Sequence, residues 1–264
     1  MFLYMTPEYD SRQFTPEWLQ TYRNPMDGSR NWFHTQVTSL PLADGASQKY
    51  SEQGEVKPLE GLSLVTFLDP KSTLVQQLTL ETQRLETAFI NEGLEDSFVF
   101  LPKHTWHVTI ADLAVSTDKQ MQEAIIKKVH TSFLTLKDKL IQTPVYHFRS
   151  DFVVSAGISL VCLAEPNSEQ DLQSIHEVRH RITEDLQPLG LPLQDPEKFI
   201  GHATIAYFKK SLDTEQYGKF KNCIKKTDVS GHTLGELQID KIELRRFASM
   251  EDWGDKSVDT LTLG

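Results

Sequence analysis

From residue 59 onward, the hydrophobic and polar positions alternate between two kinds of segment. Short apolar runs that are typical of strands cover 61–68, 98–101, 105–113, 145–154, 158–163, 201–208 and 236–247. Longer segments with apolar residues every three or four positions predict helices over 72–91, 118–140, 168–186 and 213–226. The order strand, helix, strand, helix occurs twice, which indicates an internal duplication of elements and predicts an α+β or α/β layered body.

Residues 1–58 have a different composition from the rest of the chain. They are rich in Pro, Gly, Ser, Asp and Gln, and aromatic residues are scattered among them. Only 16–22 suggests a short helix, with Thr15 as the N-cap and Pro16 in the first turn. The aromatic residues argue against simple disorder. We therefore predict an irregular N-terminal extension, 1–58, packed on a domain formed by 59–264.

Composition and charge narrow the possible partners. The chain has 264 residues, a formal net charge of −10 and a pI of about 5.4, which argue against a long nucleic-acid track. A nucleotide or a short oligonucleotide stays possible. No run of apolar residues is long enough for a membrane helix, and no signal peptide is evident at the start. Cys162 and Cys223 show no disulfide or metal spacing, so we expect a reduced, cytoplasmic protein. We also expect a monomer.

One short pattern occurs twice, ninety-five positions apart. His107-Val108-Thr109-Ile110 and His202-Ala203-Thr204-Ile205 both read His-x-Thr-apolar within an apolar run. Side chains two positions apart on a strand share a face, so each histidine projects together with its threonine. Two imidazoles can supply a general base and a general acid near neutral pH. A single His-x-Thr motif more often consists of structural strand residues, but the duplicated pair favours a catalytic site.

These two motifs in a duplicated strand–helix chain resemble the 2H phosphoesterase superfamily, which includes RNA 2′,3′-cyclic phosphodiesterases. The resemblance covers roughly 59–247, and Phe98-Val99-Phe100-Leu101-Pro102 also resembles an uncharacterised bacterial branch with an N-terminal extension. It implies an α+β bilobal fold with two pseudo-symmetric strand–helix lobes, about 59–142 and 143–250, around a central groove.

The same resemblance implies the chemistry. It predicts hydrolysis of a 2′,3′-cyclic phosphate or a small nucleotide phosphodiester without a metal or another cofactor. His202 would be the base and His107 the acid, with the roles exchanged in the reverse reaction. The hydroxyls of Thr109 and Thr204 would donate hydrogen bonds to the non-bridging phosphate oxygens.

This chain departs from many relatives just after the second motif, where they carry a basic residue and this chain has Tyr207-Phe208. Substitute phosphate ligands could be Lys103, Arg149, Arg245 or Arg246, with Tyr207 as a further candidate. Taken singly, each of these cations is expected to be a solvated surface charge rather than a phosphate ligand. Strand alternation predicts that Tyr207 faces away from His202 and that Trp106 faces away from His107, so both are expected in the core.

Two other classes of function stay open at this stage. One is a non-catalytic nucleotide-binding module of the same fold. The other is a zinc peptidase, because His176-Glu177-Val178-Arg179-His180 spells H-E-x-x-H in a predicted helix. Against the peptidase, Arg179 would place a cation beside the metal, and no further ligand motif follows. A Glu177–Arg181 ion pair on an exposed helix face is the simpler interpretation, and we expect no metal site.

Overall fold

The computed structural model describes residues 49–51, 53–115, 118–137, 143–155, 159–191, 196, 199, 201–210, 212–227 and 233–263. The predicted short helix over 16–22 and most of the N-terminal extension lie outside these residues. Among the described residues, no helix combines the length and apolar character needed to cross a membrane.

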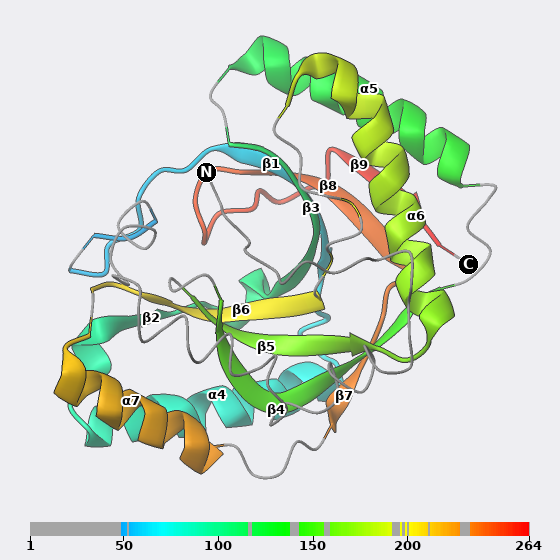
Figure 1. The fold of residues 1–264 in the computed structure, drawn as a ribbon. Coiled ribbons are helices and arrows are strands. Elements are labelled where there is room, and N and C mark those ends of the chain that lie inside the picture. Colours follow the sequence, from blue (N-terminus) through cyan, green and yellow to red (C-terminus); the bar gives the residue numbers. More distant parts are fainter. Residues whose placement is uncertain are drawn as a thin grey trace.

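A single nine-stranded sheet, which curls strongly, connects the two halves of the chain (Figure 1). Its order is β7-β4-β5-β6-β3-β1-β8-β9, with β2 paired to β6 off this path. All the strand pairings within the described part of the sheet are antiparallel. The strands are β1 (Gly61–Phe67), β2 (Phe98–Phe100), β3 (His107–Val115), β4 (Val145–Ser155), β5 (Ser159–Pro166), β6 (Gly201–Phe208), β7 (Thr233–Gln238), β8 (Lys241–Phe247) and β9 (Asp259–Thr262).

Four long helices cover the outer side of this sheet in two pairs (Figure 1). They are α4 (Thr73–Asn91), α5 (Lys119–Leu136), α6 (Glu169–Leu186) and α7 (Thr214–Thr227). Three of these helices begin where the sequence predicts. Each is capped by a side chain that accepts hydrogen bonds from backbone N–H groups of the first turn: Ser72, Asp118 and Ser168. Short 3-10 turns, η1 (Glu95–Ser97), η2 (Lys103–Thr105) and η3 (Gln187–Leu189), connect the elements. The α+β fold class is confirmed.

The helix pairs combine elements from both halves of the chain. α4 packs against α7, β7 and β4, whereas α5 packs against α6 and β9. The strands are interleaved in the same way, since β8, from the C-terminal part of the chain, lies beside β1, and β9 follows β8 at the end of the sheet. The two sides of the molecule are therefore not two contiguous stretches of chain.

The prediction of one closing strand over 236–247 is wrong. That segment contributes to β7, at one end of the sheet path, and to β8, which is next to the last strand at the other end. The backbone leaves the first strand at Ile239, whose N–H donates to Pro144 O at 2.8 Å, and Asp240 O accepts from Leu263 N–H at 2.8 Å. The apolar pattern runs through this break without interruption, so the change of partner strand depends on tertiary contacts. The short strand β9 was also not predicted.

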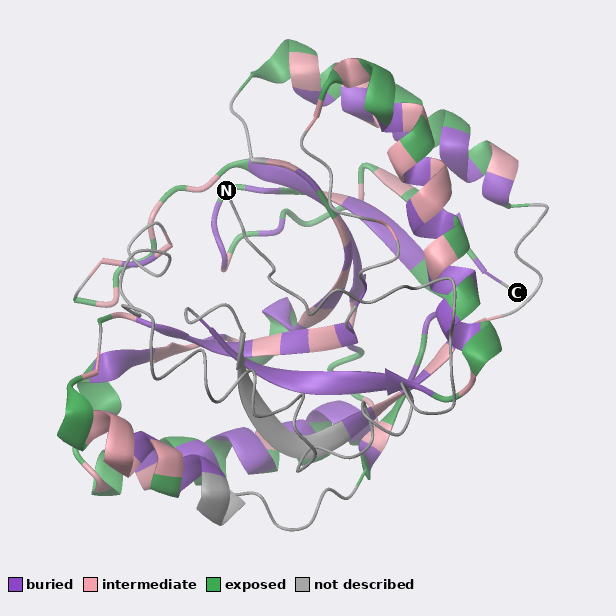
Figure 2. Cartoon of the chain, viewed as in Figure 1, coloured by how far each residue is buried: buried purple, intermediate pink, exposed green. Residues whose placement is uncertain are grey.

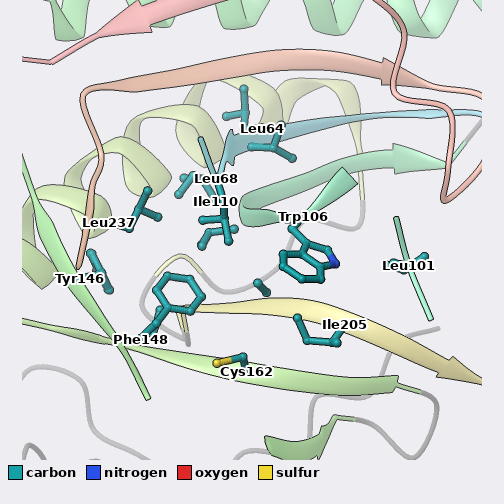
Figure 3. Packing of buried hydrophobic residues seen from close by; sticks show 14 of the residues in the cluster. Leu64, Leu68, Leu101, Trp106, Ile110, Tyr146, Phe148, Cys162, Ile205 and Leu237 are labelled. Atoms are coloured by element: carbon teal, nitrogen blue, oxygen red, sulfur yellow. The ribbon is translucent and has the colours of Figure 1, made fainter. Parts of the chain in front are cut away.

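Buried residues cover much of the central strands and alternate with exposed residues along the helices (Figure 2). Leu64, Phe148, Cys162 and Ile205 belong to one continuous cluster, and Figure 3 shows the Trp106 side chain within it. The prediction that Trp106 and Cys162 are core residues is therefore confirmed. The other face of the central strands carries the polar residues of the two motifs.

Candidate active site

The two motif strands are direct neighbours in the sheet. β3 and β6 pair antiparallel, with Val108 opposite Ala203. One step from that bridge in either direction, the antiparallel register places His107 opposite Thr204 and Thr109 opposite His202. Each histidine therefore faces the threonine of the other motif across the strand boundary.

All four motif side chains lie on the same face of the sheet. His107, Thr109, His202 and Thr204 are each partly exposed, whereas the residues between and after them, Val108, Ile110, Ala203 and Ile205, are buried in the core. Within the described part of the chain, no hydrogen bond is found for the hydroxyl of Thr109 or of Thr204. Both hydroxyls are thus available to donate to a ligand on this face.

The imidazole of His107 is held by one polar contact and by two aromatic rings. Its Nδ1 lies 2.7 Å from Thr105 O. The ring of Trp253 lies 4.2 Å from the imidazole, and the ring of Phe67 lies 5.5 Å from it, both measured between centroids. A carbonyl oxygen can only accept, so Nδ1 carries the proton in this contact. In the neutral ring Nε2 is then an unprotonated acceptor.

Burial lowers the pKa of His107 to about 4, from an ordinary value of 6.5. The bond to Thr105 O opposes this change, whereas the charges of His202 and Lys49 add to it. Although solvent reaches part of the side chain, the surrounding rings and cations disfavour an imidazolium. His107 is therefore neutral at physiological pH. The influence of His202 also shows that the two imidazoles are close enough to repel when both are protonated.

Lys49 is a residue that the sequence analysis missed. Its Nζ lies 3.1 Å from Tyr207 Oη and 4.4 Å from the centre of the Tyr207 ring. It follows a stretch of irregular composition and belongs to no motif, so no local pattern could identify it. Only the fold brings its charge near His107.

The prediction that Tyr207 faces away from His202 is wrong, although Tyr207 is buried as expected. In the β5–β6 ladder Val161 pairs with Thr204, but Leu160 pairs with Ala206, so one residue of β6 is unpaired at Ile205. This β-bulge interrupts the alternation of the strand. Tyr207 consequently lies on the same face as Thr204, and its contact with Lys49 agrees with that placement.

Arg245 is a basic candidate that the structure places near the first motif. It lies on β8, and its guanidinium carbon is 5.1 Å from the centre of the Phe67 ring, which itself contacts His107. Arg245 Nε donates to Glu243 Oε2 at 2.7 Å, and Nη1 donates to Gly254 O at 3.0 Å. Its charge is therefore largely offset by the buried Glu243 carboxylate, whose pKa is lowered by Lys241 and Arg245 against the opposing effect of burial.

The other basic candidates are placed differently. Arg246 points to the helical side, where it contacts Gln122 Oε1 at 2.7 Å and Glu123 Oε1 at 2.6 Å. Lys103 is exposed in η2. Arg149 lies in β4, opposite Thr233, and its side chain falls outside the described residues.

The H-E-x-x-H segment lies on α6, which packs on the helical side of β3 and β5. Arg179 within it is buried; its Nε donates to Pro196 O at 2.7 Å, and its Nη1 donates to Ile110 O. Arg181 pairs with Asp185 at 3.0 Å, so the expected Glu177–Arg181 pair is wrong. No group of three or more His, Cys, Asp or Glu that could hold a metal occurs among the described residues. This segment and the two His-x-Thr motifs occupy opposite faces of the sheet.

One protein-family model matches part of the chain. Residues 49–131 match the 2H-phosphodiest family, a domain of unknown function (DUF1868). The match contains Lys49 and the first His-x-Thr motif, and it confirms the resemblance to 2H phosphoesterases. No curated protein matches the chain significantly.

One solved structure supports the fold, and a second is more distantly similar. A conserved protein of unknown function from Agrobacterium tumefaciens str. C58 superimposes with a TM-score of 0.58 at 14% identity, over 86% of this chain and 97% of that one. A structure described as a phosphoesterase has a TM-score of 0.47 at 14% identity, over 78% of this chain and 99% of that one. At 14% identity, the first of these likenesses shows a shared fold and no more.

Proposed function

We propose that this protein is a metal-independent phosphodiesterase that hydrolyses a 2′,3′-cyclic phosphate or another small nucleotide phosphodiester. The observation that carries the proposal is the crossed arrangement of two histidines and two threonines around the Val108–Ala203 bridge. It offers two titrating groups and two hydroxyl donors on one partly exposed face. The match of 49–131 to the 2H-phosphodiest family supports the same class of reaction.

The contacts of His107 favour it as the general base. With Nδ1–H directed at Thr105 O, the neutral imidazole presents the Nε2 lone pair. His107 Nε2 would take a proton from water as the water oxygen bonds to phosphorus. His202 would then give its proton to the leaving oxygen as the second P–O bond breaks. The family resemblance alone implies the opposite assignment, so the two versions make different predictions.

The threonine hydroxyls would stabilise the transition state. Thr109 and Thr204 alternate with the histidines across the strand boundary, so each non-bridging phosphate oxygen can meet one hydroxyl. Negative charge on these oxygens grows during attack, and fixed donors are worth most where charge develops. The aromatic side chains of Phe67 and Trp253 keep water away from one side of His107.

The first test is turnover of nucleoside 2′,3′-cyclic phosphates by the purified protein with a chelator present. His107→Ala and His202→Ala should each lower kcat/KM by roughly 10²- to 10⁴-fold. The exposed His104 provides a matched control, and His104→Ala should retain normal turnover. Nucleotide binding without turnover in the wild-type protein would instead favour the binding module. Zinc-dependent peptidase activity abolished by His176→Ala with His180→Ala would overturn the proposal.

The second test assigns the acid and the base. A p-nitrophenyl phosphodiester has a leaving group that departs without protonation, so it does not need the general acid. If His202 is the acid, His202→Ala should regain much of its activity on this substrate, whereas His107→Ala should stay inactive. Rescue of His107→Ala alone would establish the reverse assignment.

A third test addresses substrate size. With a net charge of −10 we expect a cyclic mononucleotide or dinucleotide to be preferred over a long RNA ending in a cyclic phosphate. The rate should depend only weakly on salt, because few phosphates are contacted. A strong preference for long RNA with a steep salt dependence would contradict this expectation.

A further inference from the structure

The segment between β8 and β9 is a loop that folds back onto the strand it leaves. At the end of this loop (248–258), Val258 N–H donates to Leu244 O of β8 at 2.8 Å. Within the loop, the indole N–H of Trp253 donates to Met250 O at 3.2 Å. The side chain of Trp253 is buried. The loop therefore holds Trp253 in one orientation against the sheet.

Trp253 packs on the face of the sheet that carries the two motifs. Its ring centroid lies 5.0 Å from that of Phe247 on β8, 6.0 Å from that of Phe67 on β1 and 4.2 Å from that of His107 on β3. The ring of Phe67 also lies 5.5 Å from the imidazole. Phe67 and Trp253, the aromatic pair, thus flank the same imidazole, and its orientation depends on both rings.

The guanidinium of Arg245 contacts both parts of the molecule that supply the aromatic pair. Its central carbon lies 5.1 Å from the centre of the Phe67 ring. Its Nη1 donates to the carbonyl of Gly254, the residue directly after Trp253, at 3.0 Å. Its Nε donates to Glu243 Oε2 at 2.7 Å. One side chain of β8 therefore connects the ring on β1 with the loop that carries the indole.

This set of contacts suits an arginine and not a lysine. A guanidinium presents five N–H donors in one plane and can also lie over an aromatic ring. A lysine ammonium could pair with the Glu243 carboxylate, but it could not hold the Gly254 carbonyl and the Phe67 ring in fixed geometry as well. Glu243 is buried, and its other oxygen lies 2.7 Å from Lys241 Nζ. The carboxylate therefore fixes the guanidinium, and the guanidinium fixes the loop.

We infer that Arg245 is a positioning residue, which holds the aromatic pair against His107 and thereby fixes the imidazole for proton transfer. The inference rests on the proposed phosphodiesterase function, because this imidazole is the base of that reaction. The sequence suggests a different role for Arg245, a direct contact with the substrate phosphate. In the structure its Nε and Nη1 are directed at protein oxygens instead. A residue that acts through the aromatic pair should affect kcat more than KM, because it orients the base and does not touch the substrate.

The first test follows the loop itself, by NMR hydrogen exchange of the Trp253 indole N–H in the full-length protein. Arg245→Lys and Arg245→Met should both exchange this proton roughly tenfold faster than wild type, as expected for loss of one charge-assisted hydrogen bond. Arg246→Met is the matched control, because Arg246 is the next residue of β8 and contacts Gln122 and Glu123 on the helical side. It should leave the exchange rate unchanged.

The second test separates positioning from phosphate binding, with a nucleoside 2′,3′-cyclic phosphate as the substrate. Positioning predicts that Arg245→Lys and Arg245→Met lose kcat alike, by roughly 10- to 100-fold, with KM within about threefold of wild type. A phosphate ligand predicts that Arg245→Met raises KM, whereas Arg245→Lys stays near wild type because it keeps the charge. In a Trp253→Ala background, Arg245→Met should add little to the loss of kcat, because both changes act through the same ring.

The outcomes distinguish this inference from the proposed function, because indole exchange needs no turnover. If exchange is unchanged in both Arg245 variants, or if Arg246→Met accelerates it as much, the inference is wrong even if the enzyme is active. A raised KM that Arg245→Lys restores would make Arg245 a phosphate ligand and overturn the positioning role. If exchange accelerates as expected but wild type hydrolyses no phosphodiester, Arg245 holds the aromatic pair and the catalytic proposal fails.

Loss of Arg245 also removes one partner of the buried Glu243 carboxylate, which could unfold the variant. Melting curves identify that case. The paired variant Glu243→Gln with Arg245→Met then replaces the single one, because it removes the charge that was left behind as well as the guanidinium. The same exchange rate and the same comparison of kcat with KM apply to it.

Discussion

Removal of the Trp253 ring should move the pH at which His107 loses its function as a base. Burial is the largest cause of the low pKa of His107, and the ring of Trp253 lies 4.2 Å from the imidazole. Trp253→Ala should admit water beside the imidazole and raise its pKa from about 4 toward the ordinary value of 6.5. The acid limb of kcat/KM reports this pKa in the free enzyme.

The size of the effect follows from these two values. At pH 5, a histidine with a pKa of about 4 is about nine-tenths neutral, whereas one with a pKa of 6.5 is about 3% neutral. Full relief of burial would therefore lower kcat/KM at pH 5 by roughly 30-fold. This is an upper limit, because His202 and Lys49 still act on His107 in the variant. At pH 8 both proteins are fully neutral at His107, so the difference should nearly vanish.

The assay is kcat/KM for a nucleoside 2′,3′-cyclic phosphate between pH 4.5 and 8.5, with NMR titration of His107 as a readout independent of turnover. Trp253→Phe keeps an apolar ring beside His107, so the acid limb of its kcat/KM profile should stay at the same low pH as in wild type. Loss of a buried tryptophan costs about 3–5 kcal/mol, so the folded state of Trp253→Ala must be checked by thermal melting. An acid limb near pH 6.5 in the wild type, or an unchanged limb in Trp253→Ala, would refute the reasoning.

Three further outcomes follow from the same contacts. Thr204→Val should lower kcat about 10²-fold with little change in KM, whereas Thr204→Ser should retain most activity; equal loss in both would mean that the hydroxyl is not the donor. His107→Gln should flatten the pH dependence of stability. Because the pKa of His107 is lower in the folded state, the unfolded state binds a proton at a higher pH than the folded state does. Between pH 7 and pH 4 the free energy of unfolding, measured with urea, should therefore fall by up to about 3 kcal/mol more in wild type than in the variant. Arg179→Met should destabilise the protein by about 2–4 kcal/mol, because the buried Ile110 carbonyl and the partly buried Pro196 carbonyl lose a charged donor; an unchanged urea midpoint would contradict that role.

Local sequence signals account for most of the elements. The helical spacing of 72–91 and 168–186 agrees with α4 and α6 to within one residue at each end, because each helix has a serine N-cap that the sequence shows directly. Both motif strands lie where the apolar runs predict them. Periodicity is a local property, so it succeeds wherever one face of an element is buried along its whole length.

The arrangement of the site depended on information that is not local. Alternation placed Tyr207 on the wrong face because the bulge at Ile205 arises from pairing with β5 and has no glycine or proline to signal it. Lys49 could not be recognised because its importance comes from the residues it meets in space. The break at Asp240 stayed hidden because the apolar pattern is continuous while the partner strand changes.

The pairing of β3 with β6 explains why the two motifs carry the same spacing. A slip of one residue in this register would turn one histidine and threonine into the core and expose the apolar residues between them. The register is reinforced from the helical side, where Arg179 of α6 donates to Ile110 O directly after the first motif. The arginine that disfavours a zinc site on α6 thereby stabilises the strand that presents His107. The sheet thus separates the H-E-x-x-H segment from the two His-x-Thr motifs, and the crossed histidines and threonines lie together on the partly exposed face.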